Sequence, residues 1–162
     1  MFAFMFRGMC CVVALFLLTS TCIMPTVAQR HIRFSNCTDG GKAIRSLVVS
    51  PCNSDPCTVP AGSSINISFE LLSNQNSSFV RLDPRVRLLG LELPIPGVER
   101  DACKLMATNI TCPVSEGQPV RGTVPVHVYN FVPPVTAVTV WRVYGNMGLM
   151  ACGTTTVTVT RP

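Results

Sequence analysis

The stretch SINISFELL, residues 64–72, alternates apolar and polar side chains with a period of two. Its apolar residues stand at the odd positions from Ile65 to Leu71, and Asn66, Ser68 and Glu70 stand between them. Successive side chains of a β-strand point to opposite faces of the sheet. This period therefore predicts a strand that buries one face and exposes the other to solvent.

Similar runs lie on both sides of this stretch, and each is rich in β-branched residues and bounded by Pro, Gly, Asn or Ser. No segment keeps a helical period over three turns. Strands at this spacing predict an all-β protein that folds as one domain, a two-sheet β-sandwich. The further predicted strands span residues 46–50, 85–92, 123–131, 135–144 and 154–160.

Residues 1–28 have the features of a secretory signal. Arg7 gives a positively charged start, residues 10–18 form a continuous apolar run, and Thr26-Val-Ala28 offers small residues for cleavage after Ala28. The apolar run is too short for a membrane-spanning helix, and no later segment has 18 uninterrupted apolar residues. We therefore expect a secreted, extracellular or lysosomal protein with a single mature domain over residues 29–162.

The cysteines of the mature chain predict disulfides. Cys10, Cys11 and Cys22 leave with the predicted signal, so six of the nine cysteines remain. An even number in an exported chain implies disulfides, and six cysteines allow 15 pairings. Proximity and turn residues favour two local pairs, and the remaining pair would then join the two ends of the domain. The favoured pairs are Cys52–Cys57, Cys103–Cys112 and Cys37–Cys152.

Metal and catalytic sites find little support in this sequence. The two histidines, His31 and His127, have no partner at the spacing of metal ligands, and a zinc site needs about four ligands. We therefore expect Cys52 and Cys57 to form a structural disulfide rather than half of a metal or redox site. No G-x-S-x-G nucleophile motif occurs. The expectation is a protein that is not an enzyme and needs no metal or cofactor.

The charge pattern gives no sign of a nucleic-acid partner. The formal net charge of +5 falls by one when Arg7 leaves with the signal. The basic residues are scattered, with at most a loose group at Arg81, Arg85 and Arg87. No basic run with interleaved aromatic residues occurs, so binding to nucleic acid is not expected.

Four Asn-x-Ser/Thr sequons begin at Asn36, Asn66, Asn76 and Asn109. In an exported chain we expect glycosylation at some of them. Asn66 falls on the polar face of the predicted strand, where a glycan requires it to be. Asn36 is the weakest candidate because its neighbour Cys37 is expected to form a disulfide.

The apolar faces of the strands allow two interpretations. Charged residues make up only 13% of the chain. The inward side chains can fill an ordinary core, which would suit an adhesion or receptor-binding module. They can instead line an apolar pocket between splayed sheets, which would hold a lipid. Periodicity does not separate the two, because both place the same residues inside.

The six cysteines stand in a frame of short motifs that covers about residues 34–160. The motifs are Phe34-Ser-Asn-Cys37, Val49-Ser-Pro-Cys-Asn-Ser-Asp-Pro-Cys57, Leu93-Pro-Ile-Pro96, Ala102-Cys103, Cys112-Pro113 and Val138-Thr-Val-Trp141. With Cys152 closing the set, the sequence resembles the ML (lipid-recognition) domain family. Within that family it is similar to the Niemann-Pick C type 2 group of secreted sterol-binding proteins, including the arthropod members and the group 2 mite allergens.

This resemblance implies an immunoglobulin-like β-sandwich with the three disulfides favoured above and an apolar cavity between the sheets. A sterol or acyl chain would lie there with its polar end near the mouth and be released at a membrane, without covalent chemistry. Two family features near the mouth differ here. The Pro-Phe-Pro segment reads Pro94-Ile95-Pro96, and the tyrosines after the Cys-Pro segment are Val120 and Gly122. We expect these losses to loosen the mouth and widen the range of lipids.

The function expected on these grounds is that of a secreted protein that binds and transfers a sterol or a related lipid. The alternative is a secreted immunoglobulin-like interaction or innate-immune module that recognises microbial lipids or a receptor. We expect a monomer that contacts membranes transiently and can meet a receptor or transporter partner. The candidate lipid-binding residues are Ile65, Ile67, Phe69, Val86, Leu88, Ile95, Phe131, Trp141, Val143 and Val157.

Overall fold

The computed structural model describes residues 32–38, 40–52, 54–105 and 110–162. The predicted signal, His31 and Asn109 lie outside these residues. Every regular element within them is a β-strand. None of the described segments forms a helix that is long and apolar enough to cross a membrane.

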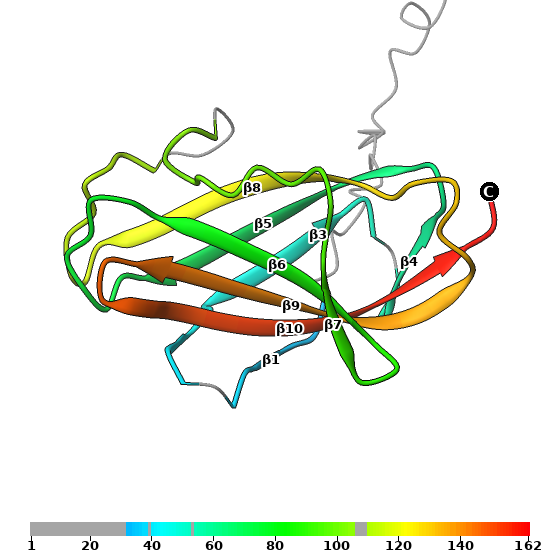
Figure 1. The fold of residues 1–162 in the computed structure, drawn as a ribbon, viewed down its shortest axis with the longest axis horizontal. Coiled ribbons are helices and arrows are strands. Elements are labelled where there is room, and N and C mark those ends of the chain that lie inside the picture. The colour runs from blue at the N-terminus through cyan, green and yellow to red at the C-terminus, as the bar shows by residue number, and fades with distance from the viewer. Residues whose placement is uncertain (1–31, 39, 53, 106–109) are drawn as a thin grey trace, which may run out of the picture.

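The strands form two facing sheets, which confirms the predicted sandwich. In the larger sheet, β1, β10, β9, β6 and β7 lie side by side in that order, with β2 and β4 also paired to β10. The smaller sheet has the order β3-β5-β8. Figure 1 shows these sheets as two layers, with β3, β5 and β8 above β9 and β10. The strands are β1 (Phe34–Asn36), β2 (Lys42–Ala43), β3 (Ser46–Ser50), β4 (Cys57–Pro60), β5 (Ser64–Leu72), β6 (Arg81–Leu88), β7 (Leu91–Pro94), β8 (Pro119–His127), β9 (Val135–Gly145) and β10 (Gly148–Thr160).

The stretch that opened the sequence analysis is β5, the central strand of the smaller sheet. Its burial alternates as its sequence does, with the odd positions buried. Ile67 pairs with Val49 of β3 on one side and with Val124 of β8 on the other, and all three are buried. The smaller sheet therefore presents one apolar face to the larger sheet.

Four predicted strands have different bounds in the structure: β9 is one residue longer than expected, β10 begins at Gly148 rather than at 154, and two others differ more. The single strand expected over 85–92 is wrong, because β6 and β7 form a hairpin there. Leu89 and Gly90 occupy its turn with φ of 49° and 83°. Positive φ at both central residues is typical of a type I′ turn, which usually carries Asn-Gly or Asp-Gly. Because Leu89 stands where Asn or Asp is usual, the sequence did not reveal this turn. The strand expected over 123–131 begins earlier and ends at His127, and residues 128–131 lie beyond it.

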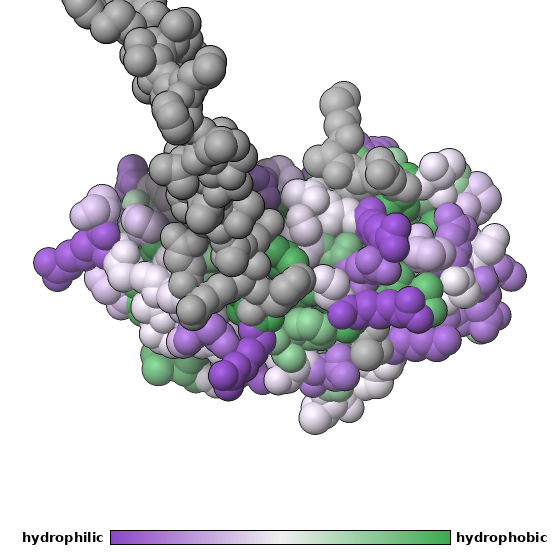
Figure 2. Space-filling view, turned by 180° about the vertical axis from the view of Figure 1, so that it is seen from behind, coloured by the Kyte–Doolittle hydropathy of each residue, from purple (hydrophilic) through white to green (hydrophobic). Residues whose placement is uncertain are grey.

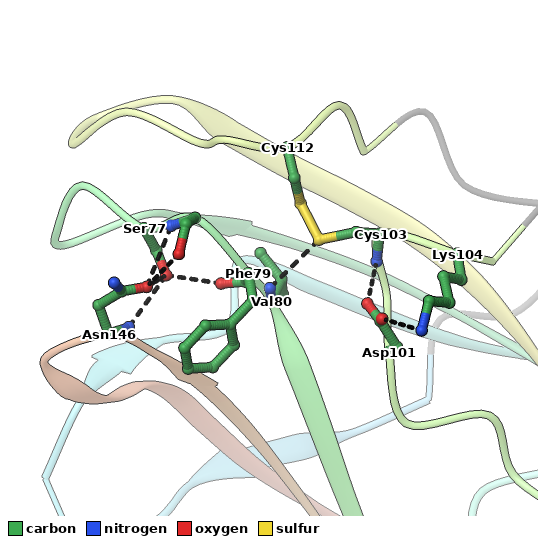
Figure 3. Close-up of a disulfide and its surroundings, with 9 residues drawn as sticks. Ser77, Phe79, Val80, Asp101, Cys103, Lys104, Cys112 and Asn146 are labelled. Carbon is green, nitrogen blue, oxygen red and sulfur yellow. Dashed lines mark hydrogen bonds and ion pairs between the residues drawn. A yellow bond between two sulfur atoms is a disulfide. The ribbon is translucent and has the colours of Figure 1, made fainter.

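The three disulfides join the cysteines that were paired from the sequence. The Cα–Cα distances are 5.4 Å for Cys37–Cys152, 5.7 Å for Cys52–Cys57 and 5.9 Å for Cys103–Cys112. The first ties the chain after β1 to β10. The third closes a loop beside β6, where the Val80 amide donates a hydrogen bond to the Cys103 sulfur at 3.3 Å (Figure 3).

A buried polar cluster fastens the chain between β5 and β6 to the turn between β9 and β10. Ser77 donates to the Asn146 side-chain oxygen at 2.7 Å and accepts from the Asn146 amide at 2.9 Å (Figure 3). Gln75, only 4% exposed, accepts a hydrogen bond from the Met147 amide. Buried polar groups need such partners. This cluster closes one end of the sandwich.

Candidate functional site

The two ends of the sandwich interior are packed differently. Toward the β9–β10 turn the core is dense, and Leu71, Leu82 and Met150 are fully buried. At the opposite end the sheets enclose an open cavity of about 370 Å³. Ligand pockets in proteins typically measure about 300–1,000 Å³. The cavity is thus large enough to hold a small apolar molecule.

Both sheets supply the inner wall of this cavity. Ile65 and Ile67 of β5 face Ala137 and Trp141 of β9 across the gap. Alternate residues of β9 share one face, so positions 137, 139 and 141 all line the cavity. Ala137 is paired with Val157 of β10, which also lines the cavity.

The mouth is formed by the β6–β7 hairpin and by the segment between β8 and β9. The hairpin contributes residues of both strands, and the second segment adds Tyr129, Phe131 and Pro133. Several large apolar side chains of this rim face solvent. Phe131 is 80% exposed, and Leu89 at the hairpin tip is fully exposed.

The rim aromatics form a contiguous row. Tyr129 and Phe131 are stacked, with ring centroids 5.3 Å apart and an angle of 19° between their planes. His127 meets Tyr129 edge-on at 5.1 Å between centroids. Tyr129 and Phe131 line the mouth, and His127 borders it at the exposed end of β8.

The cavity wall carries almost no polarity. Of its described lining residues, none is Lys, Arg, Asp or Glu. Thr139 is the one hydroxyl residue among those of the two inner walls, and it is already engaged. It donates to the Thr155 carbonyl at 3.2 Å and accepts from the Trp141 indole at 3.0 Å. Such a wall can hold an apolar molecule. Among the described residues no three metal-ligating side chains gather.

Most of the candidate lipid-binding residues come together here. Phe69 and Val143 do not line the cavity and are buried nearer the closed end of the sandwich. Those that line the cavity are Ile65, Ile67, Val86, Leu88, Ile95, Phe131, Trp141 and Val157.

Sequence reasoning missed two groups of lining residues. Ala137 and Val159 share strand faces with residues already chosen, so the period of two could have found them. Tyr129 lies beyond the end of β8, where no period exists to place it. Val120 and Gly122, expected near the mouth, do not line the cavity. The rim aromatics come instead from residues 127–131.

An ion-pair network on the outer face of the larger sheet holds the mouth hairpin in place. Glu92 of β7 accepts from the Arg142 guanidinium of β9 at 2.8 Å and also pairs with Arg87 of β6. The hydrogen bonds from Arg142 and Arg87 lower the pKa of Glu92 from 4.5 to about 2. The outer face of three adjacent strands is therefore tied together near the turn of the hairpin.

The Glu92→Gln substitution should remove a pH-dependent part of the stability. Because the folded-state pKa is lowered, this contribution is present above about pH 4.5 and is lost as the pH falls toward 2. Glu92 is partly solvated, so we expect a loss of only about 1 kcal/mol at pH 7. Urea unfolding at pH 7, 4.5 and 2 measures it. The Glu116→Gln variant, at an exposed position without an ion pair within the described part of the chain, is the control. An equal loss in Glu92→Gln at pH 7 and at pH 2 would contradict the electrostatic explanation.

The described sequons lie at the surface. Asn66 is exposed on the outer face of β5, as its alternation predicted. Asn36 is also exposed. Asn76 is exposed, and its side-chain oxygen accepts from the Glu116 amide at 2.9 Å. All three positions are accessible to a glycan, and occupancy stays a prediction.

Seen from behind, the molecule shows hydrophilic patches interspersed with smaller hydrophobic areas, outside the part covered by grey atoms (Figure 2).

The fold and the cavity define the class of protein. The model of the ML domain family matches residues 31–159. The chain therefore belongs to the ML domain family, the lipid-recognition domains it was found to resemble.

Particular relatives agree with this assignment. The mite group 2 allergen Tyr p 2 of Tyrophagus putrescentiae is 30% identical over 81% of this chain and 89% of the relative. The bovine (Bos taurus) NPC intracellular cholesterol transporter 2 is 26% identical over 68% of this chain and 72% of the relative. Among solved structures, a Niemann-Pick type C2 protein from Japanese carpenter ant matches with a TM-score of 0.71 and 17% identity, covering 79% of this chain and 99% of that one. This last match supports the fold.

Proposed function

We propose that this protein binds a sterol or a related neutral lipid in the cavity and carries it between membranes. The observation that carries the proposal is the open cavity of about 370 Å³, whose described lining includes no fixed charge. A relative that shares 26% of its sequence is a cholesterol transporter by name, which supports a sterol as the first ligand to test.

The driving force for uptake is the hydrophobic effect. Each Å² of apolar ligand surface removed from water contributes roughly 25 cal/mol. The described wall has few polar groups to desolvate, so a ligand of matching shape gains this free energy at little polar cost. The same cavity speaks against the filled-core interaction module considered from the sequence.

We further propose that the protein acts outside the cell or in lysosomes. The predicted signal at residues 1–28, the three disulfides and the accessible sequons support this location. Disulfides form and persist mainly in oxidising compartments.

Transient contact with a membrane is part of the same proposal. The fully exposed Leu89 stands at the tip of the hairpin that borders the mouth. Leu91 of the same hairpin and Phe131 of the rim are also exposed. Leucine is unusual at a turn position with positive φ, where its Cβ costs roughly 1–2 kcal/mol. Leu89 would have a reason to stand at this strained position if its side chain enters the apolar layer of a membrane during lipid exchange.

The Leu89→Asn substitution separates membrane contact from folding. Asparagine tolerates the left-handed conformation, so the free energy of unfolding should stay the same or rise. Removing a leucine that enters the bilayer should weaken binding to phosphatidylcholine vesicles by about tenfold. Vesicle co-sedimentation measures this. Met147→Asn, at an 80% exposed methionine on the opposite end of the sandwich, should leave vesicle binding unchanged. An equal effect of both substitutions would contradict a role of the mouth.

The experiment that tests lipid binding uses Trp141, which lines the cavity and is the single tryptophan of the chain. Lipid-free protein is titrated with cholesterol below its solubility limit, and Trp141 emission is followed. Native mass spectrometry of the protein secreted from eukaryotic cells identifies the lipid carried through purification. A bound lipid at a one-to-one ratio supports the proposal. A protein that arrives empty and takes up neither cholesterol nor 1-hexadecanol contradicts it.

A further inference from the structure

Among the described lining residues, the polar side-chain atoms without a hydrogen bond lie at the mouth of the cavity, on Tyr129 and His127. Of its described lining residues, those with polar side-chain atoms are Thr139, Trp141, His127 and Tyr129. Thr139 is already bonded to the Thr155 carbonyl and the Trp141 indole. A bound lipid therefore meets available side-chain hydrogen-bonding groups only at the rim.

The Tyr129 hydroxyl is held at a defined place across the mouth. A Cβ atom placed on Gly97, in the segment that follows β7, would lie 3.0 Å from this hydroxyl oxygen. Gly97 has a φ of 73°, so its backbone takes a conformation that other residues rarely adopt. Tyr129 thus extends from the end of β8 to the segment after β7. Its ring is supported by the stack with Phe131.

His127 places a second polar group beside Tyr129. Its Nδ1 lies 3.2 Å from the Ser64 hydroxyl, and its ring meets the Tyr129 ring edge-on. The Nε2 atom has no partner among the described residues. The Ser64 hydroxyl can donate to Nδ1 or accept from it, so Nε2 can serve as donor or acceptor in the neutral ring.

We propose that Tyr129 and His127 form a headgroup subsite that binds the hydroxyl group of an uncharged, otherwise apolar lipid. A phenol, a neutral imidazole and an alcohol can each donate or accept, so they can form a short hydrogen-bonded chain. A carboxylate or sulfate would need a fixed cation, and none lines the described cavity. The apolar body of the lipid then lies inward against Trp141. This inference rests on the proposed lipid binding and adds which residues would recognise the hydroxyl end of the ligand.

The test compares ligands that differ only in the hydroxyl group. The first pair is cholesterol and 5-cholestene, and the second pair is 1-hexadecanol and hexadecane, so the two arms separate a sterol from a fatty alcohol. Each ligand is titrated into wild-type protein, Tyr129→Phe and the control Tyr144→Phe at pH 7.5. Tyr129→Phe removes one hydroxyl and keeps the ring stack. Tyr144, the other tyrosine of the chain, lies on the outer face of β9 against Arg81.

We expect Tyr129→Phe to weaken binding of the hydroxylated member of a pair by about 5-fold, as for the loss of one neutral hydrogen bond. Binding of the matched hydrocarbon should not change, and Tyr144→Phe should leave every affinity as in the wild type. His127→Leu should weaken the same member selectively. Thermal unfolding of each variant shows that the fold is retained.

Two results would overturn the subsite, and they differ in what they mean for the proposed function. If Tyr129→Phe changes both members of each pair equally, or neither, the hydroxyl is not recognised there, although lipid binding itself stands. If wild-type protein binds none of the four ligands, the proposed function fails and the subsite fails with it.

Discussion

Replacement of Ala137 by phenylalanine should abolish most of the lipid binding while the protein remains folded. Ala137 lies on the inner face of β9 and lines the cavity opposite the smaller sheet. A phenyl ring at this position enters the space that a ligand must occupy. Overpacking of a well-filled interior costs roughly 1–3 kcal/mol, and here that cost falls on the complex rather than on the empty protein. The expected affinity is thus about 5- to 150-fold weaker.

The neighbouring residue provides a matched control. Val138 lies on the opposite face of the same strand, paired with Arg87 of β6 and away from the cavity. Val138→Phe adds the same ring to the same strand and should bind lipid as the wild type does. Both variants keep Trp141 as the single tryptophan, so its emission reports binding in each. If Ala137→Phe binds cholesterol with wild-type affinity, the ligand does not occupy this cavity.

Removal of the Cys37–Cys152 disulfide should produce the largest loss of stability among the three bridges. The two cysteines are 115 residues apart in sequence, so their bond restricts most of the unfolded chain. On the chain-entropy model a loop of this length contributes about 5 kcal/mol. That is comparable with the whole stability of a typical domain, about 5–15 kcal/mol. The Cys37→Ala/Cys152→Ala double variant should therefore be marginally folded at body temperature.

The two short bridges give the comparison that tests this explanation. Cys52–Cys57 and Cys103–Cys112 close separations of only 5 and 9 residues. The same model gives them about 2 and 2.6 kcal/mol. Urea unfolding of the three double alanine variants, each lacking one pair, measures all three losses. A loss for the Cys37–Cys152 variant no larger than for the other two would show that local packing, rather than chain entropy, sets their contributions.

Much of the candidate site could be predicted because its inner walls are built from regular strands. Ile65, Ile67 and Val157 lie on faces that the period of two fixes. Trp141 was chosen from the Val-x-Trp motif of the family resemblance. The same period could not exclude Phe69 or Val143. They share the inner faces, and only their distance from the open end removes them from the cavity.

The mouth was harder to predict because it is built from turns and a connecting segment. Leu89 and Gly90 form a type I′ turn without the usual Asn or Asp, so the sequence read as one strand through residues 85–92. Tyr129 lies after the end of β8, and its place is set by Gly97 from a distant part of the chain. No local pattern connects these two residues.

The sequence by itself determined the all-β sandwich, the pairing of the cysteines and the inward faces of the central strands. These follow from the alternation of side chains along each strand and from a small set of cysteines with two close pairs. Only the tertiary structure decided between a filled core and a cavity. A period of two says which side chains face the opposite sheet, but it does not say how far away that sheet lies. That separation depends on the sizes of the side chains that meet across the gap, and at the open end Ala137 leaves space that Leu71, Leu82 and Met150 fill at the other.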